Sequence, residues 1–307
     1  MKRTLKCRYY VRYVDDLILL DISPETLSQW REAIAAFLGE RLKLRLRERH
    51  AEAERVTHGI DFVGWNTFWN HRQPRGRTLG NCDTRLRRFA RRVLQPLWAT
   101  VALRLDTERQ PEALPALRAT LASYSGHLRH GAAYRKWRGL WERHGWLRAF
   151  FGRAPHDPWR VQARWPERAV GGQRFSYQYG RIIRRADHDT LVFLQVGKFV
   201  EFYGPQRILA SRAFRLVRVA MARGGFAFCV GFPLRLRQTY IARAVRAGYA
   251  VAEVREVERL SRNCAMRQIV AVWIPARWRG QGSSNAYWTK AGHTCLESSR
   301  TRIRYPA

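Results

Sequence analysis

The sequence has few acidic side chains for its size. Its 307 residues include 57 Lys and Arg but only 24 Asp and Glu, which gives a formal charge of +33. Most of the basic residues are Arg. Because so large an excess of one charge repels itself, we expect an anionic partner, and nucleic acid is the first candidate.

Cysteines and long apolar runs are also scarce. No apolar run approaches the ~20 residues of a membrane span, and no secretory signal is visible, so we expect no membrane partner. There is no Gly-x-x-x-x-Gly-Lys-Ser/Thr run, so no ATPase segment is expected. The cysteines are scattered and odd in number, which favours a reducing, cytoplasmic location over a disulfide framework. They are Cys7, Cys82, Cys229, Cys264 and Cys295.

Two adjacent carboxylates, Asp15 and Asp16, lie between two apolar runs. Residues 9–13 and 17–22 are rich in β-branched and aromatic residues, which predicts a tight hairpin with the two acids at its tip. One interpretation is structural, since Asp is common in turns. The other is a metal site, because close carboxylates repel each other unless a cation neutralises them, and Mg²⁺ prefers oxygen ligands.

Three further elements are predicted after the hairpin. Ser23-Pro24-Glu25 is typical of a helix start, and the apolar residues that follow recur at helical spacing, so one face should be buried. Those residues are Leu27, Trp30, Ile34, Phe37 and Leu38. Alternation from Leu42 to Leu46 predicts a half-buried strand, and residues 59–68 predict another strand, broken at Gly64.

The Tyr13-Val14-Asp15-Asp16 run, followed by the helix, the 42–46 strand and Gly59-Ile60-Asp61-Phe62-Val63-Gly64-Trp65, resembles the palm of reverse transcriptases. The resemblance is to the group II intron and diversity-generating retroelement branch. It covers roughly residues 1–150, which is only the second half of such an enzyme. It implies that Asp15 and Asp16 are catalytic ligands of Mg²⁺ or Mn²⁺, and that Tyr13, Gly64 and Trp65 contact a template–primer duplex.

A basic helix is expected from Arg85 to Arg104, and more helix from Pro111 to Phe150, where residues 123–130 are similar to the thumb of the same family. The first helix contains Arg85, Arg87, Arg88, Arg91 and Arg92. They form either a solvated charged face or a surface that follows phosphates, and we favour the second. Among them we predict that Arg85, Arg88 and Arg92 bind nucleic acid. Trp137, Trp141 and Trp146 are predicted to be core residues.

The rest of the chain predicts a second domain. Residues 154–180 are rich in Pro, Gly and Arg, which is typical of a linker. Strands are expected at 191–196, 199–203, 226–230, 250–257 and 268–274, and helices at 211–223 and 239–247, which together predict an α/β sheet packed by helices. The fold class is therefore α+β and α/β: a partial palm (1–80), a helical thumb-like region (81–150), a linker (151–185), an α/β domain (186–276) and a basic tail (277–307).

The second domain is similar to the N-terminal, mismatch-recognising domain of the MutS repair family. The resemblance depends on residues 195–203 (Gln-Val-Gly-Lys-Phe-Val-Glu-Phe-Tyr), the Gly231-Phe232-Pro233 turn and residues 248–251. It implies that Phe199 wedges beside a mispaired base and that Glu201 hydrogen-bonds to that base. The alternative is that Phe199 packs in the sheet and Glu201 pairs with a nearby arginine.

Three functions follow, in order of preference. The first is the C-terminal part of an RNA-directed DNA polymerase that binds template–primer. It would be inactive alone, because two metal ions need a further carboxylate from a palm half that a partner polypeptide would supply. The second is a non-catalytic module that recognises mismatched or distorted duplex through Phe199 and Glu201. The third is a decayed fragment without function.

Overall fold

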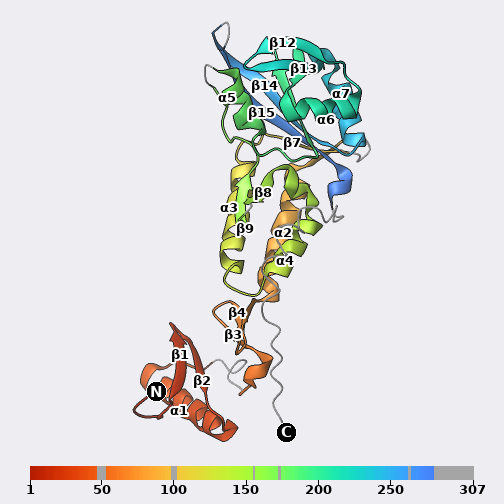
Figure 1. Ribbon diagram of the computed structural model, residues 1–307. Coiled ribbons are helices and arrows are strands. Elements are labelled where there is room, and N and C mark those ends of the chain that lie inside the picture. The colour runs from red at the N-terminus through yellow and green to blue at the C-terminus, as the bar shows by residue number, and fades with distance from the viewer. Residues whose placement is uncertain (47–52, 98–101, 155, 172–173, 262–263, 280–307) are drawn as a thin grey trace, which may run out of the picture. The chain divides into compact units, whose positions relative to one another are not determined.

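The computed structural model describes residues 1–46, 53–97, 102–154, 156–171, 174–261 and 264–279 (Figure 1). The chain divides into two compact units. The first contains residues 1–81 with 131–133, and the second contains residues 82–130 and those from 134 onward. Most of the basic tail predicted for 277–307 lies outside the described residues. Among the described residues, no helix combines the length and apolar character that crossing a bilayer requires.

The first unit begins with the predicted hairpin. Strand β1 (Tyr9–Tyr13) pairs antiparallel with β2 (Asp16–Leu20), and Tyr13 lies opposite Asp16. Val14 and Asp15 therefore form a two-residue turn, in which Val14 has a φ of 53°, a value that β-branched residues rarely adopt. The hairpin prediction is confirmed, with Asp15 in the turn and Asp16 at the start of the second strand.

Helix α1 (Pro24–Leu42) starts where the sequence predicted, because the Ser23 hydroxyl accepts a hydrogen bond from Thr26 N at 3.1 Å. The expectation that one of its faces is buried is wrong: no residue of α1 is buried, and Phe37 is 57% exposed. The strand predicted from Leu42 to Leu46 is also wrong. Leu42 ends α1, and Lys43 follows in the left-handed conformation that terminates helices.

The remainder of the first unit is a small antiparallel sheet. It consists of a 3₁₀ turn, η2 (Val56–His58), and the strands β3 (Ile60–Phe62), β4 (Trp65–Thr67) and β5 (Arg72–Pro74). Val63 and Gly64 join β3 to β4 with φ values of 46° and 86°, as a type I′ turn requires. The predicted strand over residues 59–68 is therefore a hairpin that reverses at Gly64.

An eight-stranded sheet forms the centre of the second unit. The strand order is β12-β13-β11-β10-β14-β15-β7-β6, and only the β10–β14 pair is parallel. The strands are β6 (Gln95–Leu97), β7 (Ala102–Asp106), β10 (Thr190–Val196), β11 (Phe199–Phe202), β12 (Val219–Arg223), β13 (Phe226–Pro233), β14 (Ala250–Ser261) and β15 (Cys264–Pro275). Five of these match the strands predicted between residues 191 and 274.

The two faces of this sheet are covered by different helices (Figure 1). Helices α6 (Gly204–Phe214) and α7 (Arg237–Arg246) pack on one face, where Val200 and Phe202 of β11 join their apolar residues in one core. The 3₁₀ turn η4 (Leu234–Leu236) precedes α7. Helix α5 (Phe175–Ile183) contacts the opposite face, because its Tyr179 ring packs edge-on against the ring of Tyr203, 5.6 Å between centroids, and the Tyr203 side chain alternates with that of Phe202.

A helical region adjoins the sheet within the same unit. It contains α2 (Gly76–Val93), which begins in the first unit, α3 (Ala113–Leu128), α4 (Tyr134–Arg143), and the 3₁₀ turns η3 (Gly145–Ala149) and η5 (Ala276–Arg279). Trp137, Trp141 and Trp146 are at most 8% exposed, which confirms that they are core residues. The Trp146 ring stacks on Phe89 of α2 with centroids 5.7 Å apart.

Three predictions about this unit are wrong. The basic helix expected to reach Arg104 ends at Val93, and β6 and β7 follow. The stretch 151–185 is no linker: it contains the hairpin β8 (Phe151–Ala154) and β9 (Asp157–Ala163), and then α5. The helix expected at 211–223 is the end of α6 followed by β12.

The boundary between a thumb-like region and an α/β domain is also absent from the described structure. Strand β7, from the predicted thumb, pairs with β15 along its whole length, from Ala102 opposite Pro275 to Asp106 opposite Ala271. Thr107 extends the contact, since its N donates to Val270 O at 3.1 Å and its Oγ1 to Ile269 O at 2.5 Å. The helical region and the sheet are therefore one folded body.

Candidate nucleic-acid interface

The turn between β10 and β11 presents Phe199 to solvent. Gly197 and Lys198 form a two-residue turn, and Val196 lies opposite Phe199. Gly197 has a φ of 57°, which suits the first central position of a type II′ turn. Phe199 is 49% exposed and makes no aromatic contact with the described residues. Phe199 is therefore partly covered by the protein and partly open to solvent.

Glu201 lies two residues further along β11, so its side chain is on the same face of the strand as Phe199. It is 9% exposed. Both of its described donors reach the same oxygen: Tyr203 Oη and Arg223 Nη1, the latter at 3.1 Å, donate to Glu201 Oε2. Glu201 Oε1 has no partner among the described residues, so it is the oxygen that can accept a hydrogen bond from a ligand.

Burial and the neighbouring carboxylate act together on Tyr203. Burial raises the pKa of its hydroxyl, and the hydrogen bond to Glu201 raises it further, so Tyr203 stays a donor at any physiological pH. Arg223 supplies the positive charge that offsets the carboxylate. The expectation that Glu201 pairs with a nearby arginine therefore holds for Oε2 alone.

A buried ion pair lies beneath the turn that presents Phe199. Arg267 Nη2 donates to Glu256 Oε1 at 2.7 Å, and Arg267 Nη1 donates to Gln178 Oε1 of α5 at 2.5 Å. The same Glu256 oxygen accepts from Gly197 N at 3.4 Å. Burial lowers the pKa of Arg267, and the charge of Glu256 opposes that change. This pair links the turn to β14, β15 and α5.

Sequence reasoning missed the residues that surround Glu201 and the turn. Tyr203 was within reach, because a residue two positions after Glu201 on a strand shares its face. Arg223, Glu256 and Arg267 were not, because they come from β12, β14 and β15 and meet this site only through sheet pairing. Nothing in their local sequence distinguishes them from the chain's many other charged residues.

One comparison with known proteins bears on the sheet. The family model of MutS domain I matches residues 173–278, about a third of the chain. The match includes Phe199 and Glu201, and it supports the predicted MutS-like domain while extending it to include α5. MutS domain I is a DNA-mismatch-recognising domain, so this part of the chain is similar to a nucleic-acid-binding domain. The match does not reach the residues that resemble a reverse transcriptase.

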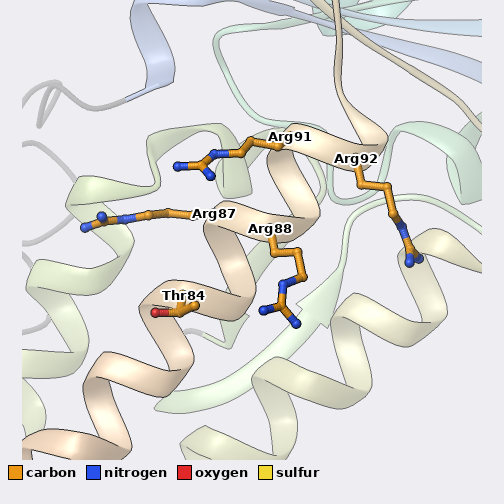
Figure 2. Close-up of a pocket in the computed structure, with 5 residues that line it drawn as sticks. All are labelled: Thr84, Arg87, Arg88, Arg91 and Arg92. Atoms are coloured by element: carbon orange, nitrogen blue, oxygen red, sulfur yellow. The ribbon is translucent and has the colours of Figure 1, made fainter.

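The arginines predicted to follow phosphates lie on one exposed face of α2. Figure 2 shows the side chains of four of them, Arg87, Arg88, Arg91 and Arg92, extending outward from the helix. An open hollow of about 420 Å³ lies at this surface. Its lining residues are Thr84, Arg87, Arg88, Arg91 and Arg92. Arg87 pairs with Asp83 at 2.6 Å, and Arg85 lies over the Tyr124 ring, 5.8 Å from its centroid. The opposite side of α2 is buried through Leu86 and Val93. A role for Arg85, Arg88 and Arg92 in binding remains a prediction.

The residues of the predicted palm site belong to two different hairpins of the first unit. Tyr13, Asp15 and Asp16 are exposed at the end of the β1–β2 hairpin. Gly64 forms the β3–β4 turn, and Trp65 is 8% exposed with Arg72 over its ring, 5.0 Å from the centroid. Trp65 is therefore packed within the unit, and contact with nucleic acid would require it to become accessible.

Asp15 and Asp16 by themselves do not fit a two-metal site. Asp15 lies in the turn and Asp16 begins β2, and together they supply only two carboxylates. In the part of the chain that the structure describes, no group of three or more His, Cys, Asp or Glu gathers to hold a metal ion. Two metal ions would need further oxygen ligands from outside these residues.

Proposed function

We propose that this chain binds duplex nucleic acid and recognises mispaired or distorted steps through the β10–β11 hairpin. The observation that supports this function is the placement of Phe199, which is 49% exposed, and Glu201 Oε1, an acceptor without a partner among the described residues, on one face of one strand. The MutS domain I match over residues 173–278 points to the same class of ligand.

Each residue has a distinct role in this proposal. The apolar ring of Phe199 inserts beside a base step, which is easiest where pairing is already weak. Glu201 Oε1 accepts a hydrogen bond from an N–H group of the displaced base. Arg223 neutralises the carboxylate, so that Glu201 approaches a polyanion at a smaller electrostatic cost. The chain's charge of +33 provides the affinity that does not depend on sequence.

The test is the ratio of affinities for a mismatched and a fully matched duplex, measured by fluorescence anisotropy with the full chain. We expect Phe199→Ala to lower that ratio by about tenfold, since stacking of an aromatic side chain on a base contributes ~1–3 kcal/mol. Phe228→Ala is the matched control, because Phe228 is another exposed phenylalanine of the same sheet, at 38%. An unchanged ratio in Phe199→Ala, or no preference in the unmodified chain, would refute the proposal.

A second candidate function is the C-terminal part of a retroelement reverse transcriptase, in which Asp15 and Asp16 hold Mg²⁺ or Mn²⁺. The observation that favours it is the uncovered hairpin and helix of the first unit: no residue of α1 is buried, and Tyr9, Val11 and Tyr13 are more than half exposed. A partner polypeptide that completes the palm sheet would cover these side chains and supply the missing carboxylate.

This second candidate makes a prediction about the isolated chain. Without further metal ligands, the purified chain should not extend a primer on an RNA template in the presence of Mg²⁺. Extension by the unmodified chain that disappears in Asp15→Asn would contradict the requirement for a partner. Activity that arises only after a palm-bearing polypeptide is added, and again depends on Asp15, would support the candidate.

A further inference from the structure

The chain between Glu201 and Glu253 contains no acidic residue. It contains nine arginines: Arg207, Arg212, Arg215, Arg218, Arg223, Arg235, Arg237, Arg243 and Arg246. Only two of them form ion pairs among the described residues, Arg223 with Glu201 and Arg237 with Glu253. The other seven have no acidic partner there. A positive surface of this extent therefore belongs to the MutS-like domain itself.

Four of the unpaired arginines lie on the two helices that cover one face of the sheet. Arg212 is in the last turn of α6 and Arg215 caps that helix, while Arg243 and Arg246 are in the last turn of α7. All four are exposed. We refer to these four residues as the α6–α7 arginine surface.

The two helices bring these side chains into one neighbourhood. Helix α6 packs against α7, and the Arg243 guanidinium lies over the ring of Phe214, 5.6 Å from its centroid. Phe214 immediately precedes Arg215. Arg243 also lies over the Tyr240 ring, 5.0 Å from its centroid. Stacking on two rings holds Arg243 beside the end of α6 without neutralising its charge.

This surface is on the other face of the sheet from the Phe199 hairpin. The core beneath α6 and α7 includes Val200 and Phe202, which alternate along β11 with Phe199 and Glu201. Successive side chains of a strand point to opposite faces. A ligand bound at the α6–α7 arginine surface would therefore not occupy the site that contains Phe199.

Stabilisation of the helices explains only part of this charge. A cation near a helix C-terminus interacts favourably with the helix dipole, and each C-terminus is equivalent to roughly half a negative charge. The two ends together offset about one of the four positive charges, which leaves an excess of about three. This excess has no acidic partner among the described residues.

We propose that the α6–α7 arginine surface binds the phosphate backbone of a nucleic acid. Guanidinium groups bind phosphate oxygens in bidentate fashion, and each phosphate that they neutralise releases a counterion. The surface presents no carboxylate that would repel a backbone. The chain thus contacts nucleic acid on both faces of its central sheet, with the hairpin side selective for distortion and the α6–α7 side independent of sequence.

The test measures how the affinity for a short, fully matched duplex depends on salt, using the full chain with Phe199→Ala to remove the hairpin contribution. The test variant changes all four arginines of the surface to Gln. The control variant changes four exposed arginines of the same unit that already have acidic partners, so it removes the same formal charge. These are Arg109, Arg118, Arg143 and Arg259.

We expect the slope of log K against log salt to become shallower by about 3 to 4 in the test variant, at roughly 0.9 for each lost contact, and by less than about 1 in the control. A variant with Lys at the same four positions keeps the positive charge and should retain most of the slope. This comparison distinguishes lost phosphate contacts from misfolding. Equal changes in test and control variants would overturn the proposal. So would a test variant that loses binding to phosphatidylserine vesicles while its slope on the duplex is unchanged.

Discussion

Replacing Leu105 by Ala tests whether the helical region and the sheet unfold as one body. Leu105 is in β7 and is 0% exposed, and it lies opposite Val272 of β15. Truncating a fully buried leucine removes its transfer free energy and leaves a cavity, which together cost about 2–5 kcal/mol. Since domains of ordinary stability unfold with about 5–15 kcal/mol, this is a large fraction of the total.

Native-state hydrogen exchange of the β10 amides, with Leu191 and Leu194 as probes, shows which part of the unit loses stability in Leu105→Ala. Both residues are fully buried and lie three strands from β7, across β14 and β15. If the sheet is one cooperative unit, the opening free energy of these amides falls by the same 2–5 kcal/mol as global stability, within about 0.5 kcal/mol.

The matched control is Leu236→Ala. Leu236 is in the same unit but is 40% exposed, so its truncation should change stability by no more than about 0.5 kcal/mol. The reasoning would be refuted if Leu105→Ala weakened protection only in α2, α3 and α4 and left the β10 amides at their original protection. That outcome would restore a boundary between a separate thumb and the α/β domain.

Two further predictions concern buried charged groups of the same unit. His144 Nε2 donates a hydrogen bond to Asp83 Oδ1 at 2.9 Å, and burial lowers the pKa of the His144 imidazole, with Asp83 offsetting only part of that effect. In the unfolded chain His144 binds a proton near the ordinary histidine pKa of about 6.5, whereas in the folded chain it stays neutral to lower pH. The free energy of unfolding should therefore fall as the pH is lowered from about 7.5 to 5.5. His144→Gln should reduce that fall, as measured by denaturant titrations. Arg267→Met removes the buried partner of Glu256, whose side chain is only 14% exposed, and should destabilise by about 3 kcal/mol in the same assay. Arg259→Met removes the exposed partner of the same carboxylate and should cost less than about 1 kcal/mol, so equal effects would contradict the role given to the buried pair.

Strands with a strong local pattern were predictable from the sequence. The apolar run that became β10, the Gly197-Lys198 turn and the return strand β11 lie where the residues indicated, because a glycine-containing turn between two β-rich runs specifies a hairpin. The β1–β2 hairpin was predictable from two β-rich runs with the acids Asp15 and Asp16 between them. In each case the information lies within about a dozen consecutive residues.

Elements that depend on distant partners were not predictable in this way. The basic helix was extended through Pro96, although proline cannot donate a backbone hydrogen bond and usually stops a helix nearby. Residues 102–106 form strand β7 because they pair with β15, which lies more than 160 residues later in the sequence. Conversely, residues 42–46 alternate as a strand would, but they pair with no strand among the described residues, and Leu42 is the last residue of α1.

The residues of the candidate site show the same difference between local motifs and distant partners. Phe199 and Glu201 were identified from a motif within one hairpin, whereas Arg223 and Arg267 became visible only when the sheet brought β12 and β15 to that hairpin. The tryptophans were correctly assigned to the core from helical spacing. Trp65, assigned to a surface role by family resemblance, is packed against Arg72.

Only one of the two carboxylate oxygens of Glu201 accepts hydrogen bonds within the described residues, and this determines how glutamine would be oriented at this position. In Glu201→Gln, Tyr203 and Arg223 can donate only to the amide carbonyl, so the carbonyl must take the place of Oε2. The amide NH₂ then stands where Oε1 was and points outward as a donor. The substitution would thus change this outward-facing group from an acceptor to a donor. If the hairpin binds a displaced base as proposed, the variant would favour bases that expose ring nitrogens or carbonyl oxygens over those that expose N–H groups.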